Sequence, residues 1–366
     1  MLSSQYVQIL FWIGAMYLVQ RFVKTDHMEW AGGRMEVRAD GLFALLTFFP
    51  VIWMAGCRGY IGDSFVYANT FAGMPDTFAG FLGYLNPAGK DWAFFALSCL
   101  IRLFTDREWI YFIIIAAFQG LILVYVYRKY SCSYLTSVFL FVASTDYISW
   151  MFNGIRQFLA VTIIFAGTGW MIEGKHIRVI LLIIAASQFH KSALLMIPVY
   201  LIARGRAWND RTILFMLLAL LSVLFVHQFT GIMEYLLADT QYENMMTDMS
   251  IYNDDGTNPI RALVYFVPTV LAFIGREAIE KTDDPLISLC TNMSLISAGF
   301  YLISVFTSGI FIGRLPIYAS LYGYILLPWE INYLYKDRSR LLVYVLMILF
   351  YLAFYYFQMH MGWGMF

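Results

Sequence analysis

Charged residues are scarce in this sequence. Asp, Glu, Lys and Arg make up 13% of its 366 residues, about half the share in a soluble domain, whereas hydrophobic residues make up 61%. Such a chain lacks the polar surface of an ordinary soluble protein, and we expect it to bind no nucleic acid. The composition predicts an integral membrane protein.

Cysteine is also rare. The four cysteines, Cys57, Cys99, Cys132 and Cys290, do not have the spacing of metal ligands, so we expect no metal site and no cofactor. We also expect no cleavable signal peptide, because no basic region precedes the first apolar run at 6–19 and no small-residue cleavage motif follows it. This run should remain as the first membrane span.

Apolar runs of helical length recur along the chain, and ten-residue stretches of alternating polarity do not. Because only helices and closed barrels can span a bilayer, this pattern predicts helices. We expect an all-α polytopic membrane protein, a single integral membrane domain over residues 1–366 with about ten full transmembrane helices. The expected spans lie at 6–19, 41–57, 109–127, 135–150, 158–172, 213–230, 262–274, 286–306, 315–334 and 341–357.

The segment 177–202 is apolar at both ends and polar in the middle, from Ser187 to Ser192. It fits either one tilted helix of about 39 Å or a broken, re-entrant helical hairpin. With the hairpin, sixteen of the 24 Lys and Arg residues share one membrane face; with a single helix the division is ten to fourteen and the bias is lost. The positive-inside rule favours the hairpin, which places both termini on the outer face.

The same topology places two loops on the outer face. Residues 58–108 form a polar segment, and its short apolar run at 92–104 predicts an interfacial helix. Residues 231–260 form an acidic loop that we interpret as a candidate lid over a ligand with sugar hydroxyls.

Basic residues at the ends or breaks of spans gather on this outer face, where they should be depleted. They include Arg58, Arg156, Lys191, Arg261 and Arg314, with His190 beside Lys191. An unpaired arginine facing lipid costs roughly 3 kcal/mol, so these side chains should face protein, water or an anion. The group predicts a site for a membrane-bound phosphate or pyrophosphate. Two alternatives stay open: the arginines could bind lipid headgroups or acidic loop residues independently, or Arg156 could be a snorkelling residue that merely ends a helix.

Three short motifs resemble those of one family. Arg58 to Asp63, with Tyr67, resembles the Phe-Arg-x-x-x-Gly-x-Asp-x-x-x-Tyr signature of the EpsG family, which belongs with the Wzy-type polysaccharide polymerases. Residues 153–157 resemble its Asn-x-x-Arg-Gln element, and residues 189–193 its Phe-His-x-Ser-Ala element. In two departures, Cys57 replaces an aromatic residue, and Gly62 and Asp63 lack the intervening residue, which leaves the role of Asp63 open.

The resemblance implies a polymerase of the bacterial inner membrane with a GT-C-like helical bundle. Its substrate would be an undecaprenyl-pyrophosphate-linked oligosaccharide, and it would join such repeats at the outer face by glycosyl transfer without a metal. The expected partners are membrane lipids, a chain-length regulator and a flippase. Two other functions stay open: a flippase or transporter of lipid-linked oligosaccharide, and a ligase of the O-antigen type.

The resemblance also implies roles for single residues. Arg156, with Arg58, Arg314, Lys191 and Arg261, would hold the donor pyrophosphate and stabilise the charge that grows on it. His190 would accept the proton of the attacking hydroxyl, since imidazole titrates near neutral pH, with Asp63 as the competing base. Asn153, Gln157 and Tyr67 would bind sugar hydroxyls; the alternative for Asn153 and Gln157 is that they merely cap the helix that begins there. The alternative for His190 is a structural one, capping the broken helix.

Overall fold

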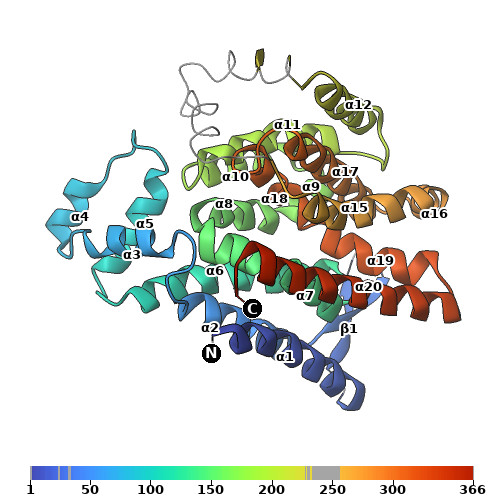
Figure 1. Ribbon diagram of the computed structural model, residues 1–366, viewed down its shortest axis with the longest axis horizontal. Coiled ribbons are helices and arrows are strands. Elements are labelled where there is room, and N and C mark those ends of the chain that lie inside the picture. Colours follow the sequence, from blue (N-terminus) through green and yellow to red (C-terminus); the bar gives the residue numbers. More distant parts are fainter. Residues whose placement is uncertain are drawn as a thin grey trace. The chain divides into compact units, whose positions relative to one another are not determined.

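The computed structural model describes residues 2–23, 25–31, 34–226, 228, 231–232 and 256–365. Helices dominate it, and its strands within these ranges are one antiparallel hairpin of β1 (Asp26–Ala31) and β2 (Arg34–Ala39), with Asp26 opposite Ala39 (Figure 1). The chain forms two compact units, Met1–Ile197 with Met347–Phe366, and Pro198–Leu346. Both units are helical. The interpretation of the whole chain as one integral membrane domain stays a prediction.

The first unit contains most of the motif residues. Its helices are α1 (Leu2–Phe22), α2 (Gly41–Gly56), α3 (Ser64–Ala72), α4 (Phe78–Tyr84), α5 (Trp92–Arg102), α6 (Glu108–Tyr130), α7 (Tyr134–Ala143), the π-helix η1 (Tyr147–Asn153), α8 (Ile155–Ala166), α9 (Thr168–Ile172), α10 (His176–Ser187) and the 3-10 helix η2 (Lys191–Leu195). Further along the chain, α11 (Met196–Ala203) leads into the second unit. The first unit is completed by the part of α20 (Asp337–Phe357) from Met347 on and by η4 (Gln358–Gly362). In α20, the Tyr355 hydroxyl donates to the Tyr6 carbonyl of α1 at 2.9 Å.

Two glycines let α2 and α6 pack closely. A Cβ added at Gly56 would lie 2.6 Å from Ile113 Cβ, and one added at Gly120 would lie 2.6 Å from Ile52 Cγ1. Small residues at such contacts are the usual means of close helix packing in a membrane. On its other side α6 packs against α8. The packed helices α6 and α8 support the motif residues.

The second unit is built around α17 (Pro285–Val305), which is almost wholly buried. The other helices are α12 (Asp210–Leu224), α15 (Pro259–Ile274), α16 (Arg276–Thr282), the 3-10 helix η3 (Ile312–Arg314), α18 (Ile317–Ser320) and α19 (Gly323–Leu334). α12, α15, α18, α19 and η3 all pack against α17.

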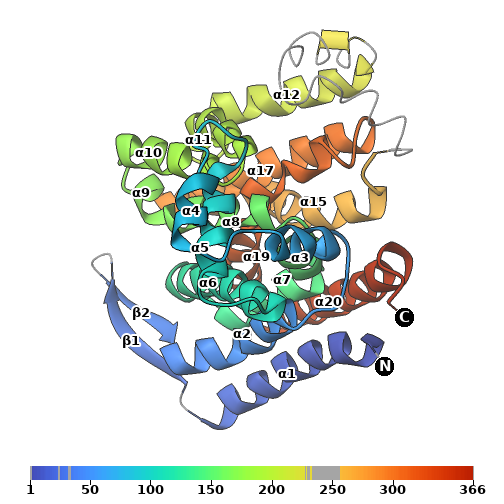
Figure 2. The same ribbon diagram turned by 90° about the vertical axis from the view of Figure 1, so that its left-hand side faces the viewer.

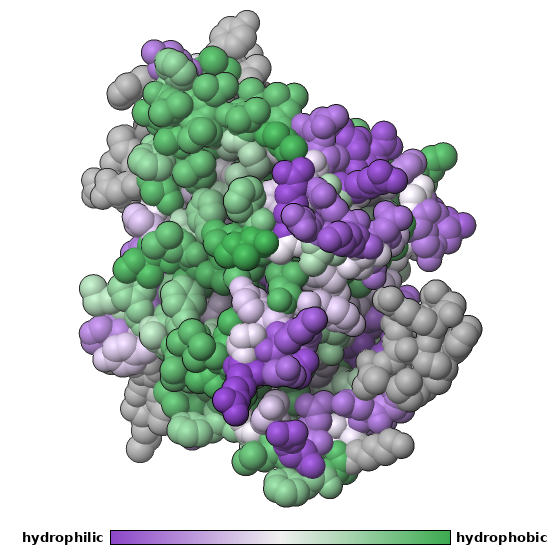
Figure 3. All heavy atoms as spheres, turned by 90° about the vertical axis from the view of Figure 1, so that its right-hand side faces the viewer, coloured by the Kyte–Doolittle hydropathy of each residue, from purple (hydrophilic) through white to green (hydrophobic). Residues whose placement is uncertain are grey.

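Membrane-spanning helices are present but fewer than expected. Within the described ranges, three helices are long and apolar enough to cross a membrane, Glu108–Tyr130, Pro285–Val305 and Asp337–Gly362, and two more spans result if each pair of helices bent by 73° counts as one. Large apolar side chains are exposed on these and other helices, as expected for contact with lipid, and green hydrophobic areas are broad in Figure 3. An all-α membrane protein is confirmed, and about ten spans stay a prediction.

Several expected spans are broken rather than continuous. The run 135–150 divides into α7 and η1 because Thr145 has a positive φ of 62°, which no helix accommodates. The run 158–172 divides at Gly167, and 315–334 divides between α18 and α19. Apolar composition does not report such breaks, since each depends on local backbone geometry.

The segment 177–202 breaks where its polar centre predicted. α10 ends at Ser187, and η2 begins at Lys191. Its path through the membrane as a re-entrant hairpin stays a prediction.

In the loop 58–108, α5 confirms the short helix expected at 92–104. The helices α3 and α4 in the same loop were not expected. The hairpin of β1 and β2 is a correction, because residues 24–40 were interpreted only as a charged connection. Most of the acidic loop 231–260 lies outside the described residues.

Candidate functional site

The first two motifs meet at the start of α3. The backbone N–H of Asp63 donates to Asn153 Oδ1 at 2.8 Å, and the Ser64 hydroxyl donates to the Phe152 carbonyl at 3.2 Å. Gly62 has a φ of +53°, and a Cβ there would lie 2.3 Å from Asn153 Oδ1. Only glycine fits this position. The Asn153 amide therefore ties the end of the π-helix to the loop before α3.

Arg58 also holds the junction between the end of the π-helix η1 and the loop before α3. Its guanidinium lies 3.9 Å from the centre of the Phe112 ring and 5.4 Å from that of Phe152, and it donates to the Met151 carbonyl. Burial lowers the pKa of Arg58 to about 9, so the side chain is still charged at neutral pH. These contacts give Arg58 a structural role, and its contact with pyrophosphate stays a prediction.

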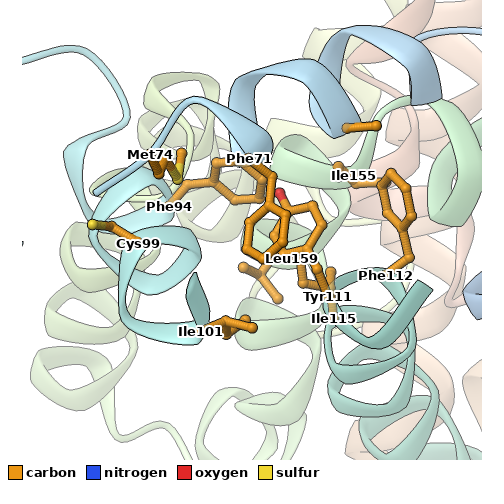
Figure 4. Packing of buried hydrophobic residues seen from close by; sticks show 11 residues of the cluster. Phe71, Met74, Phe94, Cys99, Ile101, Tyr111, Phe112, Ile115, Ile155 and Leu159 are labelled. Atoms are coloured by element: carbon orange, nitrogen blue, oxygen red, sulfur yellow. The ribbon is translucent and has the colours of Figure 1, made fainter. Parts of the chain in front are cut away.

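An apolar cluster supports this junction. Phe71, Phe94 and Tyr111 pack with Ile155 and Leu159 of α8, as Figure 4 shows. The rings of Phe71 and Tyr111 stack with centres 4.3 Å apart. The cluster anchors α3 and α5 to α6 and to the first turn of α8, and the helices of the 58–108 loop lie in front of α6 in Figure 2. The residue that follows Ile155 is Arg156.

Arg156 is fixed on one side and open on the other. Its Nη1 donates to Asp91 Oδ2 at 3.0 Å, and its Nε donates to the Tyr67 hydroxyl at 3.4 Å. The Arg156 side chain is 31% exposed, whereas Asp91 is fully buried. The Nη2 group has no partner among the described residues. A fixed guanidinium with unused donors at a partly open position can bind an anion.

Asp91 joins the second motif to the third. Its Oδ2 accepts from Arg156, and its Oδ1 accepts the backbone N–H of Lys191 at 3.2 Å. It precedes α5 with a φ of 53°, and its carboxylate does not cap that helix. Burial raises the pKa of Asp91, and the nearby Arg156 and the Lys191 N–H oppose the shift. The sequence analysis missed Asp91, because an aspartate before an apolar helix looks like an ordinary helix cap.

Two hydrogen bonds hold the segment after α10 against the start of α5. Trp92 Nε1 donates to Gln188 Oε1 at 2.9 Å, and the Ala93 N–H donates to the Gln188 carbonyl at 3.1 Å. The Gln188 carbonyl lies at the C-terminal end of α10, where it has no hydrogen-bond partner within the helix. The polar centre of the broken segment is thereby held beside Asp91 and Arg156.

His190 and Lys191 lie in this docked segment, and both are half-buried. His190 Nδ1 lies 2.7 Å from the Ser192 hydroxyl, a hydrogen bond that orients the imidazole. The His190 side chain makes no cap hydrogen bond to η2, and both the catalytic and the structural interpretation of this residue stay predictions. The Lys191 ammonium extends from the residue whose N–H binds Asp91.

The chain can now be compared with known proteins. The family model described as the EpsG family matches residues 41–363. This chain belongs to the EpsG family. EpsG is a Wzy-like polymerase family, so the resemblance drawn from the three motifs is confirmed. A comparison with curated proteins and one with solved structures each found no match.

The three EpsG-type motifs are therefore neighbours in the first unit, linked through Asn153, Asp91 and Tyr67. Gln157 is buried within α8 and Asn153 is bonded to the loop, so their contacts with sugar stay predictions. Arg261 and Arg314 belong to the second unit, where Arg261 lies 5.9 Å from the Tyr265 ring and Arg314 ends η3. Their part in the site stays a prediction as well.

Proposed function

We propose that this EpsG family member is a glycosyltransferase that polymerises oligosaccharide repeats carried on undecaprenyl pyrophosphate, at the outer face of the bacterial inner membrane. Family membership supports a polysaccharide polymerase of the membrane. The observation that carries the proposal is the position of Arg156, held by Asp91 and Tyr67 with its remaining donors open.

In the proposed reaction Arg156 binds the donor pyrophosphate. As the bond between the anomeric carbon and the phosphate oxygen breaks, negative charge grows on the leaving pyrophosphate. A guanidinium already fixed in place stabilises that charge without reorganising, which is usually the largest contribution to such catalysis. The ammonium of Lys191, next along the chain to His190, supplies a second positive charge at the same locus.

His190 is the base of this reaction. The acceptor hydroxyl attacks the anomeric carbon, and its proton passes to the imidazole. The contact between Nδ1 and the Ser192 hydroxyl orients the ring. Asp63 is the alternative candidate for the base. It lies in the junction between η1 and α3, where Asn153 holds its backbone.

Polymerisation by purified protein tests the proposal. With synthetic lipid-linked repeats, the wild type should lengthen the glycan into a ladder of products. Arg156→Lys keeps the charge but loses the planar fork, so its product should fall at least about tenfold. The matched control is Arg107→Lys, since Arg107 is exposed in the same loop region. A wild type that moves the lipid-linked repeat across vesicles without lengthening it is a transporter and contradicts the proposal. An Arg156→Lys protein that polymerises normally makes Arg156 a boundary anchor only.

A further inference from the structure

An acidic side chain is buried without a partner in the second unit. Glu330 lies in α19 with no exposed surface, and neither of its carboxyl oxygens has a hydrogen-bond partner within the described part of the chain. No basic side chain of those residues acts on its charge. An isolated carboxylate in such surroundings is so costly that a neutralising species is required.

Buried hydroxyls without partners lie on the neighbouring helix. Thr291, Ser294 and Ser297 follow one another at three-residue steps along α17, so they share one side of it. Their hydroxyl oxygens are all buried and all lack a partner among the described residues. Buried hydroxyls are normally hydrogen-bonded, and several exceptions together indicate a bound ion or water.

α19 packs against α17, and one contact sets the register of the two helices. A Cβ added at Gly323, the first residue of α19, would lie 3.6 Å from Ser294 Oγ. Glu330 follows seven residues later on the same face, about 10 Å along the helix axis. It lies within electrostatic range of Cys290, the neighbour of Thr291. α19 therefore runs antiparallel to this part of α17, with Glu330 level with the turn that holds Cys290 and Thr291.

We propose that this seam binds a small monovalent cation, Na⁺ or K⁺. The carboxylate and the hydroxyls do not bond to one another. An ion beside Glu330 and Thr291 balances the carboxylate charge, and water that accompanies it can satisfy Ser294 and Ser297, which lie further along α17. Water alone would satisfy the hydroxyls but leave the carboxylate charge uncompensated. A proton alone would neutralise Glu330 and leave the hydroxyls without partners. One carboxylate balances one positive charge, and the described residues contain no cluster of three His, Cys, Asp or Glu side chains for a transition metal.

Thermal unfolding of the purified full chain tests this site. At constant ionic strength, NaCl or KCl should raise the melting temperature of the wild type above its value in choline chloride, by on the order of 5 °C at saturation. Thr291→Val should raise the cation concentration for half the shift about tenfold, since one ligand is lost. Glu330→Gln should abolish the shift. Glu280→Gln is the control, because that side chain is exposed on α16, and it should keep the shift.

Direct binding of radioactive sodium to the wild type tests the site even if Glu330→Gln does not fold. We expect one ion per chain, which choline does not displace. The proposal is wrong if the wild type melts at one temperature in all three salts and binds no sodium, or if Glu330→Gln retains the response. A wild type that is stabilised by acid but not by Na⁺ or K⁺ shows that Glu330 holds a proton instead, and this result also overturns the cation site.

Discussion

Replacement of Asp91 is the sharpest test of how the site is held together. Asp91→Ala removes the acceptor of Arg156 Nη1 and of the partly buried Lys191 N–H. Breaking a buried charged pair costs about 3–5 kcal/mol, but Arg156 is 31% exposed and water can replace part of that loss. Alanine also tolerates the φ of 53° poorly, by roughly 1 kcal/mol. We therefore expect a loss of about 3 kcal/mol of unfolding free energy.

Asp91→Asn should cost less, about 1–2 kcal/mol, because asparagine tolerates a positive φ and keeps an acceptor oxygen. At roughly 2–4 °C per kcal/mol, the melting temperature should fall by about 6–12 °C for the alanine variant. Differential scanning fluorimetry in detergent measures both shifts. Asp76→Ala is the matched control, since Asp76 is exposed in the same loop region. If Asp91→Ala melts no lower than Asp76→Ala, Asp91 does not hold the site.

The pH dependence of this stability has a definite sign. Burial raises the pKa of Asp91, so the folded protein holds that proton more tightly than the unfolded chain does. The stability of the wild type relative to Asp91→Asn should therefore be greatest at low pH and decrease as pH rises through the raised pKa. Unfolding of both proteins over a pH series measures this difference, and an increase with pH contradicts the burial argument.

Three further predictions concern other parts of the chain. His190→Gln should keep donor binding but slow turnover at least roughly a hundredfold; if the variant instead turns over at the wild-type rate, the base role passes to Asp63. Gly62→Ala should destabilise the protein by about 2 kcal/mol or more, because its Cβ would meet Asn153 Oδ1; Gly83→Ala, with open space at its Cβ, should not. Single cysteines at Ser131 and Ser339 should resist an impermeant thiol reagent in intact cells, and labelling there would reject the topology.

The sequence predicted the features that depend on local composition. α2, α6 and α17 lie where apolar runs of helical length were expected, and the break before η2 lies where polar residues interrupt such a run. The break at Thr145 was missed because a positive φ at a threonine has no sequence signature. The hairpin of β1 and β2 was missed because each strand is only six residues long and rich in charged residues.

The site, too, combines residues that local sequence predicts with residues that depend on tertiary contacts. The motifs predicted Arg156, His190 and Lys191 as parts of one site, and the structure places the Arg156 guanidinium and the Lys191 backbone N–H at Asp91. Asp91 itself was not predicted, because its partner Arg156 is 65 residues away and no local pattern links the two. Arg58 was predicted as a phosphate ligand from its charge, its position at the end of a span and its family motif. Its position between the Phe112 and Phe152 rings depends on tertiary packing, which the charge does not reveal.

The central claim is that Arg156 binds the pyrophosphate of a lipid-linked donor, and donor affinity tests it most directly. The measurement is binding of undecaprenyl pyrophosphate to the purified wild type, Arg156→Lys and the exposed control Arg107→Lys. Because a bidentate contact distinguishes arginine from a point charge, Arg156→Lys should weaken binding at least about tenfold while Arg107→Lys binds like the wild type. Equal affinity of all three proteins, at equal folded amounts, would contradict the claim.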